Sequence, residues 1–125
     1  NFGNAANRLN EANVAYKRNS VNDIYQDALI KRFEFTFELA WKTLREFMLD
    51  QGYSLEILSP KGVISFAWRE GIISIEELWQ DMLQSRNMSA HDYGRELSAD
   101  IADKISNRYC KELTALKKYI ADSLK

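Results

Sequence analysis

The sequence predicts an all-α protein, an up-and-down antiparallel four-helix bundle with one extra short helix. The 125 residues include only one proline and five glycines, so few positions would interrupt long helices. Apolar residues also recur at spacings of three and four over most of the chain, which is the period of a helix with one buried face. This length suits one domain, and we expect residues 1–125 to form a single helical bundle.

Two long helices are predicted in the first half of the chain. Residues 4–18 carry one apolar stripe, and a longer and broader one follows as far as about residue 51. Asn22 is suited to cap the second helix because its side chain can accept from free amides, and Gly52 is suited to end it. The residues of the two stripes are Ala5, Leu9, Ala12, Tyr16, Leu29, Phe33, Phe35, Phe37, Ala40, Trp41, Leu44, Phe47 and Met48.

The second half predicts one short helix and two longer ones. Ser59 before a proline is a helix start, and Gly71 is expected to end that short helix. "SIEE", residues 74–77, matches a capping box that would open the next helix at Ser74. A final long helix is expected to begin near Ser98 or slightly earlier. Its apolar ladder is Ile101, Ile105, Tyr109, Leu113, Leu116 and Ile120.

Composition excludes several functional classes. The net charge of −1 gives no overall field for nucleic acid, so any such binding would need a local groove. No apolar run is long enough to span a membrane, no signal-peptide pattern is present, and the missing initiator Met indicates a trimmed N-terminus. One His and one Cys make no metal-ligand cluster, so we expect no metal and no cofactor. Cys110 is expected as a small core or surface residue in a cytoplasmic protein.

The stretch "SRNMSAHDYG", residues 85–94, is the main candidate site. In a straight helix Arg86 and His91 would lie about 140° apart. Gly94 and the polar residues before it indicate that the helix ends near His91, which would let the imidazole fold back toward the guanidinium. Such a pair could clamp a phosphate and move a proton without a metal. The alternative is a histidine that merely caps a helix C-terminus.

Further candidates lie beside this pair and on the second helix. Asn87 could orient the histidine or a phosphate, and Tyr93 could accept a modification. The alternatives are an ordinary solvated residue at Asn87 and an aromatic ring packed on the bundle at Tyr93. Glu34, Glu38 and Lys42 are spaced four apart, as in a solvated ladder of ion pairs. Alternatively, Glu34 or Lys42 would approach the arginine of the fourth helix. The aromatic residues of this second helix are expected in a core or an interface and not as a base-stacking surface.

Three stretches together point to a family. They are "KRFEFTFELAWKTLREFM" (31–48), "SPKGVISFAWREGII" (59–73) and "RNMSAHDYG" (86–94). The chain resembles the nucleotidyltransferase substrate-binding proteins, a branch of the HEPN superfamily of helical bundles, from about residue 5 to 122.

The resemblance implies a usually dimeric four-helix bundle that forms a complex with a minimal nucleotidyltransferase. Many HEPN members are metal-independent RNases that act as toxins, with the nucleotidyltransferase as antitoxin. Their R-x4-H motif falls here on Arg86 and His91, and the polar residue after the arginine on Asn87. In some members the partner transfers AMP to a tyrosine two residues after the histidine, which here is Tyr93.

These implications leave three hypotheses. In the first, the chain is the partner- and substrate-binding subunit of the nucleotidyltransferase, binds nucleotide or RNA phosphate, and forms the HEPN half of a toxin–antitoxin pair. In the second, it is an RNase that uses Arg86 and His91 and is silenced through Tyr93. In the third, it is a structural helical adaptor. Candidates for a homodimer face are Phe35, Trp68 and Trp79.

Overall fold

Most of the described chain is helical. We analysed a computed structural model, which describes residues 1–54, 59–91 and 94–124. Its elements over these residues are α1 (Phe2–Arg18), α2 (Asp23–Asp50), α3 (Pro60–Arg69), α4 (Glu76–Ser89), α5 (Arg95–Lys104), a π-helical segment η1 (Ile105–Tyr109) and α6 (Cys110–Ser123). The prediction of an all-α protein is confirmed.

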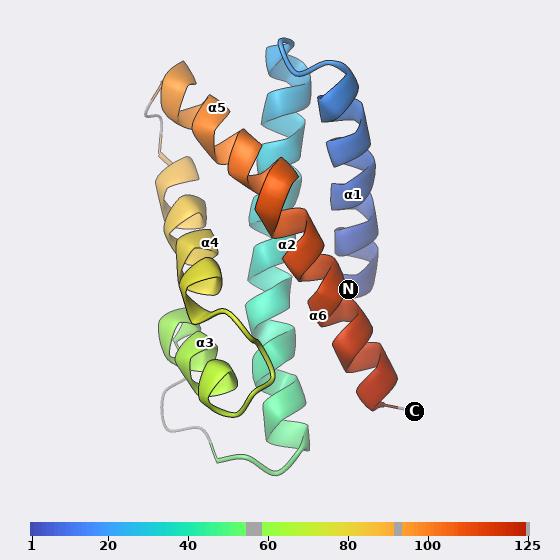
Figure 1. The fold of residues 1–125 in the computed structure, drawn as a ribbon, viewed down its shortest axis with the longest axis vertical. Coiled ribbons are helices and arrows are strands. Elements are labelled where there is room, and N and C mark those ends of the chain that lie inside the picture. The colour runs from blue at the N-terminus through green and yellow to red at the C-terminus, as the bar shows by residue number, and fades with distance from the viewer. Residues whose placement is uncertain (55–58, 92–93, 125) are drawn as a thin grey trace.

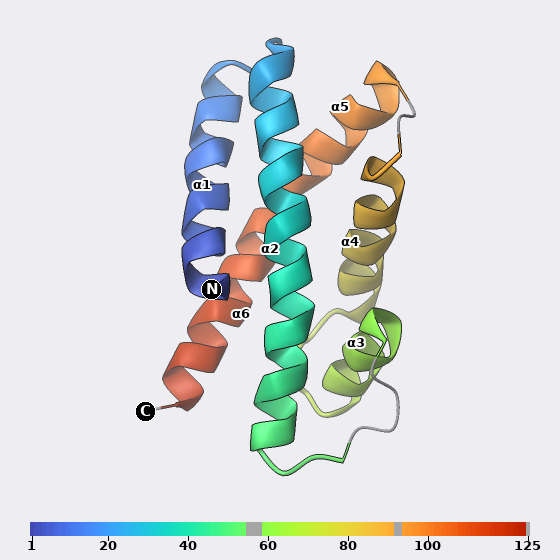
Figure 2. The same cartoon turned by 180° about the vertical axis from the view of Figure 1, so that it is seen from behind.

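Helix α2 is the centre of the bundle and contacts every other element (Figures 1 and 2). Helix α1 lies antiparallel to α2 on one side, and α4 runs along the other. The short α3 packs beside the C-terminal end of α2. Helices α5 and α6, joined by η1, form one continuous rod that crosses α2 obliquely. The predicted up-and-down arrangement with one extra short helix is therefore present.

One connected apolar core holds these helices together, and α2 supplies much of it. Phe33, Phe37, Leu44 and Met48 are fully buried along one face of α2, as the stripe predicts. Phe35 is the exception because its side chain is 61% exposed, so its assignment to the buried apolar face of this helix is wrong. It lies between the buried positions in a helix whose period is about 3.6 residues, which turns it to solvent.

Two of the predicted helix starts are confirmed, and one is wrong. The Asn22 side chain accepts from the backbone N–H of Ile24 at 2.9 Å, and Ser59 Oγ accepts from that of Gly62 at 3.2 Å. Ser74 does not cap α4, because that helix begins one residue later than the capping box requires. Its N-cap is Ile75, with no side-chain cap bond. Burial of the preceding Ile73 in the core fixes the chain just before this start.

This difference gives a matched pair of serine variants. Replacing Ser59 by alanine removes the oxygen that accepts from a free amide at the start of α3, and is expected to lower the free energy of unfolding by about 1 kcal/mol. Replacing Ser74 by alanine removes no cap and should change it by less than about 0.5 kcal/mol. Urea unfolding followed by circular dichroism measures both. An equal loss in the two variants would contradict the assignment of the caps.

The final rod begins at Arg95, slightly before Ser98, and is interrupted by a π-helical turn that the sequence did not predict. Residues four apart advance about 40° beyond a full turn in an α-helix, so a ladder of i+4 steps drifts off the core. The π turn inserts an extra residue and keeps Ile105, Tyr109 and Leu113 all fully buried. The carbonyl of Ser106, inside this turn, accepts from Asn13 Nδ2 of α1 at 3.4 Å.

Candidate functional site

An ion-pair cluster joins α2 to α4. The carboxylate of Glu38 on α2 lies at its centre, with Oε1 3.1 Å from Lys42 Nζ and Oε2 3.3 Å from Arg86 Nη1 of α4. Trp41 Nε1 also donates to Glu38 Oε2, at 3.2 Å. Three donors from two helices therefore share one carboxylate, and Glu38 fixes the guanidinium of Arg86 against α2.

These neighbours change the acidity of Glu38. Partial burial alone would raise the pKa of its carboxyl. The hydrogen bonds from Trp41 and Lys42, with the charge of Arg86, outweigh burial and lower the pKa below its ordinary value. Glu38 is therefore held as a carboxylate and acts as an anchor for the cations around it.

The Arg86 side chain is fixed by its contacts but is still partly exposed to solvent. Its side chain is 28% exposed, and its Cζ lies 6.0 Å from the centroid of the buried Phe37 ring, within range of a cation–π contact. Its Nε is buried and has no hydrogen-bond partner among the described residues. An N–H that is removed from water without a partner costs free energy. One edge of the guanidinium thus binds Glu38, while the buried Nε finds no acceptor in the part of the chain that the structure describes.

A second link between the helices involves Glu34. Ser89, the last residue of α4, has its Oγ 3.0 Å from Glu34 Oε2 and 3.1 Å from the carbonyl oxygen of Arg86. Glu34 therefore meets the final turn of α4, and Lys42 reaches Arg86 only through their shared partner Glu38. The structure thus brings both residues to the α2–α4 contact, although neither is shown touching the guanidinium.

The helix ends ahead of the histidine, as predicted from Gly94. The last helical residue of α4 is Ser89, Ala90 is the C-cap, and the His91 backbone N–H donates to the carbonyl of Met88 at 3.1 Å. Gly94 has a φ of +92°, a left-handed conformation that glycine adopts readily. The His91 side chain is exposed. Arg86 and His91 thus lie near one end of α4 and neither is sealed in the core.

Asn87 and Tyr93 are the two remaining predicted residues of the helix-end site. Asn87 is exposed on α4, and Tyr93 lies outside the described residues. Glu38 was not predicted as a site residue, because its spacing indicated only an ion pair with Lys42. The spacing of Glu34, Glu38 and Lys42 was a visible signal, but periodicity along one helix does not say which side chain of another helix will meet it.

The lone cysteine of the chain is not in a reactive environment. Burial raises the pKa of the Cys110 thiol to about 12, so the thiol is not poised as a nucleophile. Among the described residues there is no group of three or more His, Cys, Asp and Glu side chains that could hold a metal ion. No helix in the described part of the chain combines the length and apolarity needed to cross a membrane.

Fold and site together define a helical bundle with a fixed arginine and an exposed histidine at one helix end. A family described as nucleotidyltransferase substrate binding protein like matches residues 1–122, and the chain belongs to this family.

Two solved structures share the fold. A crystal structure of a protein from Thermus thermophilus is 26% identical with a TM-score of 0.67, over 94% of this chain and 98% of that one. A Haemophilus influenzae protein, described as having the fold of a substrate binding domain of a nucleotidyltransferase, is 24% identical with a TM-score of 0.78, over 96% of each chain. No curated protein sequence matches the chain at the significance required.

Proposed function

We propose that this chain is the binding subunit of a minimal nucleotidyltransferase and presents a nucleotide or RNA phosphate to it, with Arg86 and His91 as the phosphate-binding pair. Family membership over residues 1–122 supports the partnership. The observation that carries the site is the state of Arg86: its guanidinium is anchored by Glu38 and its side chain is partly exposed, in the last turn of the helix that ends just before the exposed His91. In this proposal the chain is also the HEPN half of a toxin–antitoxin pair and works as a homodimer in the cytoplasm.

The charges of the α2–α4 cluster favour recognition of a phosphate by well-placed hydrogen bonds over its attraction by a general positive field. Glu34 and Glu38 offset the charges of Lys42 and Arg86, so the cluster presents no large positive field. A phosphate would be recognised through directional, charge-assisted hydrogen bonds from a guanidinium whose place is already fixed. Preorganisation of this kind reduces the ordering cost of binding. We therefore expect Arg86 to matter through its geometry, and Glu38 to matter as the residue that positions it.

The test of the phosphate site is the affinity for a short single-stranded RNA. Arg86→Gln keeps a polar side chain of similar length but loses the charged fork, and should weaken binding about 10-fold, the loss expected for one charge-assisted contact. Arg18→Gln, an exposed arginine at the end of α1, is the matched control and should bind as the wild type does. Fluorescence anisotropy measures both, and equal affinities in the two variants would reject Arg86 as a phosphate ligand.

A second function is favoured by the exposure of His91 beyond the end of α4. An imidazole near neutral pH can take a proton from a ribose 2′-hydroxyl. The 2′-oxygen would then attack phosphorus, the 5′-oxygen would leave with a proton from water or from a second protomer, and a 2′,3′-cyclic phosphate would result. In this alternative Arg86 stabilises the charge on the phosphate. The chain would then be a metal-independent RNase, silenced when the partner transfers AMP from ATP to the Tyr93 oxygen with release of pyrophosphate.

Two assays distinguish the RNase function from the function as a binding subunit. His91→Ala should lower RNA cleavage by at least about 100-fold if the histidine is the general base, and equal cleavage by wild type and variant would assign the activity to a contaminant. Incubation with the nucleotidyltransferase, ATP and magnesium should add the mass of one AMP to the chain. The addition should vanish in Tyr93→Phe, and a gain that survives this change would reject Tyr93. Failure of the two proteins to co-elute in size-exclusion chromatography would reject the partnership itself.

A further inference from the structure

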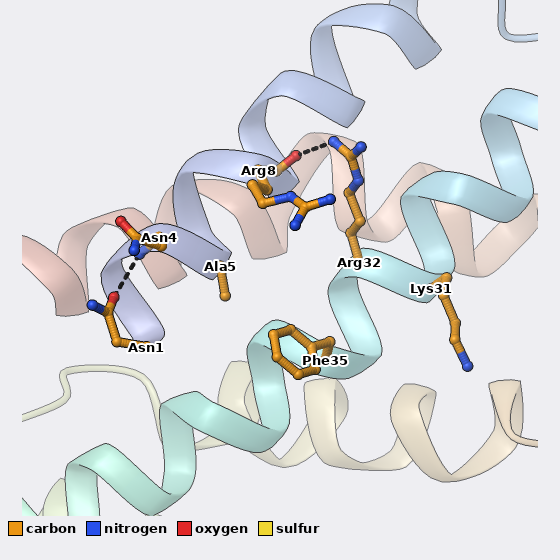
Figure 3. Close-up of a pocket in the computed structure, with 7 residues that line it drawn as sticks. All are labelled: Asn1, Asn4, Ala5, Arg8, Lys31, Arg32 and Phe35. Carbon is orange, nitrogen blue, oxygen red and sulfur yellow. Dashed lines mark hydrogen bonds between the residues drawn. The ribbon is translucent and has the colours of Figure 1, made fainter.

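A hollow of about 370 Å³ lies between α1 and α2, in a different groove from the α2–α4 cluster (Figure 3). It is lined by Asn1, Asn4, Ala5, Arg8, Lys31, Arg32 and Phe35. Its volume falls at the lower end of the range of about 300–1,000 Å³ that is usual for small-molecule sites. The hollow is therefore large enough to take part of a small ligand.

The charges around this hollow are all of one sign. Arg8 comes from α1 and Lys31 and Arg32 come from α2, and no lining residue carries a carboxylate. In a chain with a net charge of −1, three cations without an acidic neighbour in the lining are a local departure from the average. Like charges on two packed helices repel one another, and a bound anion would relieve that repulsion.

One of the two guanidinium groups is fixed in place. Arg32 Nη1 donates to the backbone carbonyl of Arg8 at 2.7 Å, across the gap between the helices. Figure 3 shows the Arg8 guanidinium reaching from α1 toward Arg32, above the ring of Phe35, while Lys31 extends from α2 away from α1. The two arginine side chains therefore lie close together, and Lys31 lies apart from them. The planar guanidinium of an arginine is suited to binding phosphate oxygens.

Phe35 adds a flat apolar surface beside these cations. Its side chain is 61% exposed, although neighbouring phenylalanines of α2 are buried. A single exposed aromatic ring needs no explanation by itself. Next to two arginines, however, it offers a face on which a nucleobase can stack, an interaction worth a several-fold change in affinity.

We propose that this hollow binds a nucleotide, with its phosphates on Arg8 and Arg32, additional attraction from Lys31, and its base on Phe35. The site uses none of the residues of the α2–α4 cluster and does not depend on the function proposed above. A bare inorganic anion would use the arginines but leave the ring exposed. A nucleotide uses both features, so the geometry favours it over phosphate alone.

The test measures binding of ADP, pyrophosphate and adenosine by isothermal titration calorimetry. ADP should bind most tightly, because it alone contacts both the arginines and the ring. Arg8→Gln keeps the backbone carbonyl that holds Arg32, and should weaken both ADP and pyrophosphate about 10-fold. Lys31→Gln should have a smaller effect, about 3-fold, because its side chain extends away from the arginines. Phe35→Leu keeps an apolar side chain but loses the aromatic face, and should weaken ADP about 5-fold while leaving pyrophosphate unchanged.

Two controls make the outcome decisive. Arg18→Gln makes the same charge change as Arg8→Gln at another exposed position of α1, and should leave ADP binding unchanged. Arg86→Gln should also leave it unchanged, whatever that variant does to RNA binding. The proposal is overturned if Arg8→Gln and Arg18→Gln bind ADP equally. It is also overturned if Phe35→Leu weakens pyrophosphate as much as ADP, or if Arg86→Gln accounts for the loss. Thermal melts verify that these surface variants remain folded.

Discussion

Replacing Trp79 by alanine is expected to lower the free energy of unfolding by about 4 kcal/mol, within the range typical of a buried aromatic residue cut to a methyl group. Trp79 is fully buried in α4, and its ring centroid lies 6.3 Å from that of Phe37 on α2. Its Nε1 donates to Glu112 of α6 at 3.1 Å. The variant therefore leaves a cavity among three helices and removes a hydrogen bond. Urea unfolding with circular dichroism as the signal measures the loss.

Trp68 is the matched control because it is the same residue type on the neighbouring helix α3 but is 46% exposed. Trp68→Ala should cost less than about 1 kcal/mol, since much of that surface already meets water. If the two variants lose equal stability, the packing described for α4 is incorrect.

Trp79 is also one of the three candidates for a homodimer face. Its complete burial excludes its side chain from any such face, whereas Trp68 and Phe35 remain accessible.

Replacing Tyr109 by phenylalanine is expected to lower the free energy of unfolding by about 2 kcal/mol, in the range for a buried partner left without its hydrogen bond. The phenol oxygen lies 2.8 Å from Ser85 Oγ and donates to Asp81 Oδ2 at 2.5 Å, so it joins η1 to α4. Burial, reinforced by Asp81, raises the pKa of this phenol, which keeps it protonated as the donor. The variant keeps the ring but leaves the buried Ser85 hydroxyl without this partner.

Tyr119 on α6 provides the comparison for this change. It is 42% exposed, and its ring meets Phe47 edge-on at 6.0 Å, a contact that phenylalanine would keep. Tyr119→Phe should therefore change the free energy of unfolding by less than about 0.5 kcal/mol. Chemical denaturation measured in parallel on both variants decides the matter. A loss below about 0.5 kcal/mol in Tyr109→Phe would show that the link between η1 and α4 does not stabilise the fold.

The candidate site was only partly predictable from the sequence. Gly94 and the polar residues before it located the helix end, and the structure places that end at Ser89, before His91. The partner of Arg86 was not predictable, because Glu34, Glu38 and Lys42 share one stripe and all could face α4. Only the rotation and offset of α2 against α4 select Glu38 for the guanidinium and Glu34 for Ser89.

The sequence by itself determined the helices, because helix formation depends on a local period of about 3.6 residues and on local capping chemistry. It located α1 and α2 closely, the caps at Asn22 and Ser59, and the buried face of α2. Tertiary packing decided what depends on distant segments. It placed Trp79 inside and Trp68 outside, imposed the π turn in the final rod, and brought Arg8 and Arg32 together on two helices. Burial of apolar surface sets the register between helices, and a pattern read along one helix carries no information about that register.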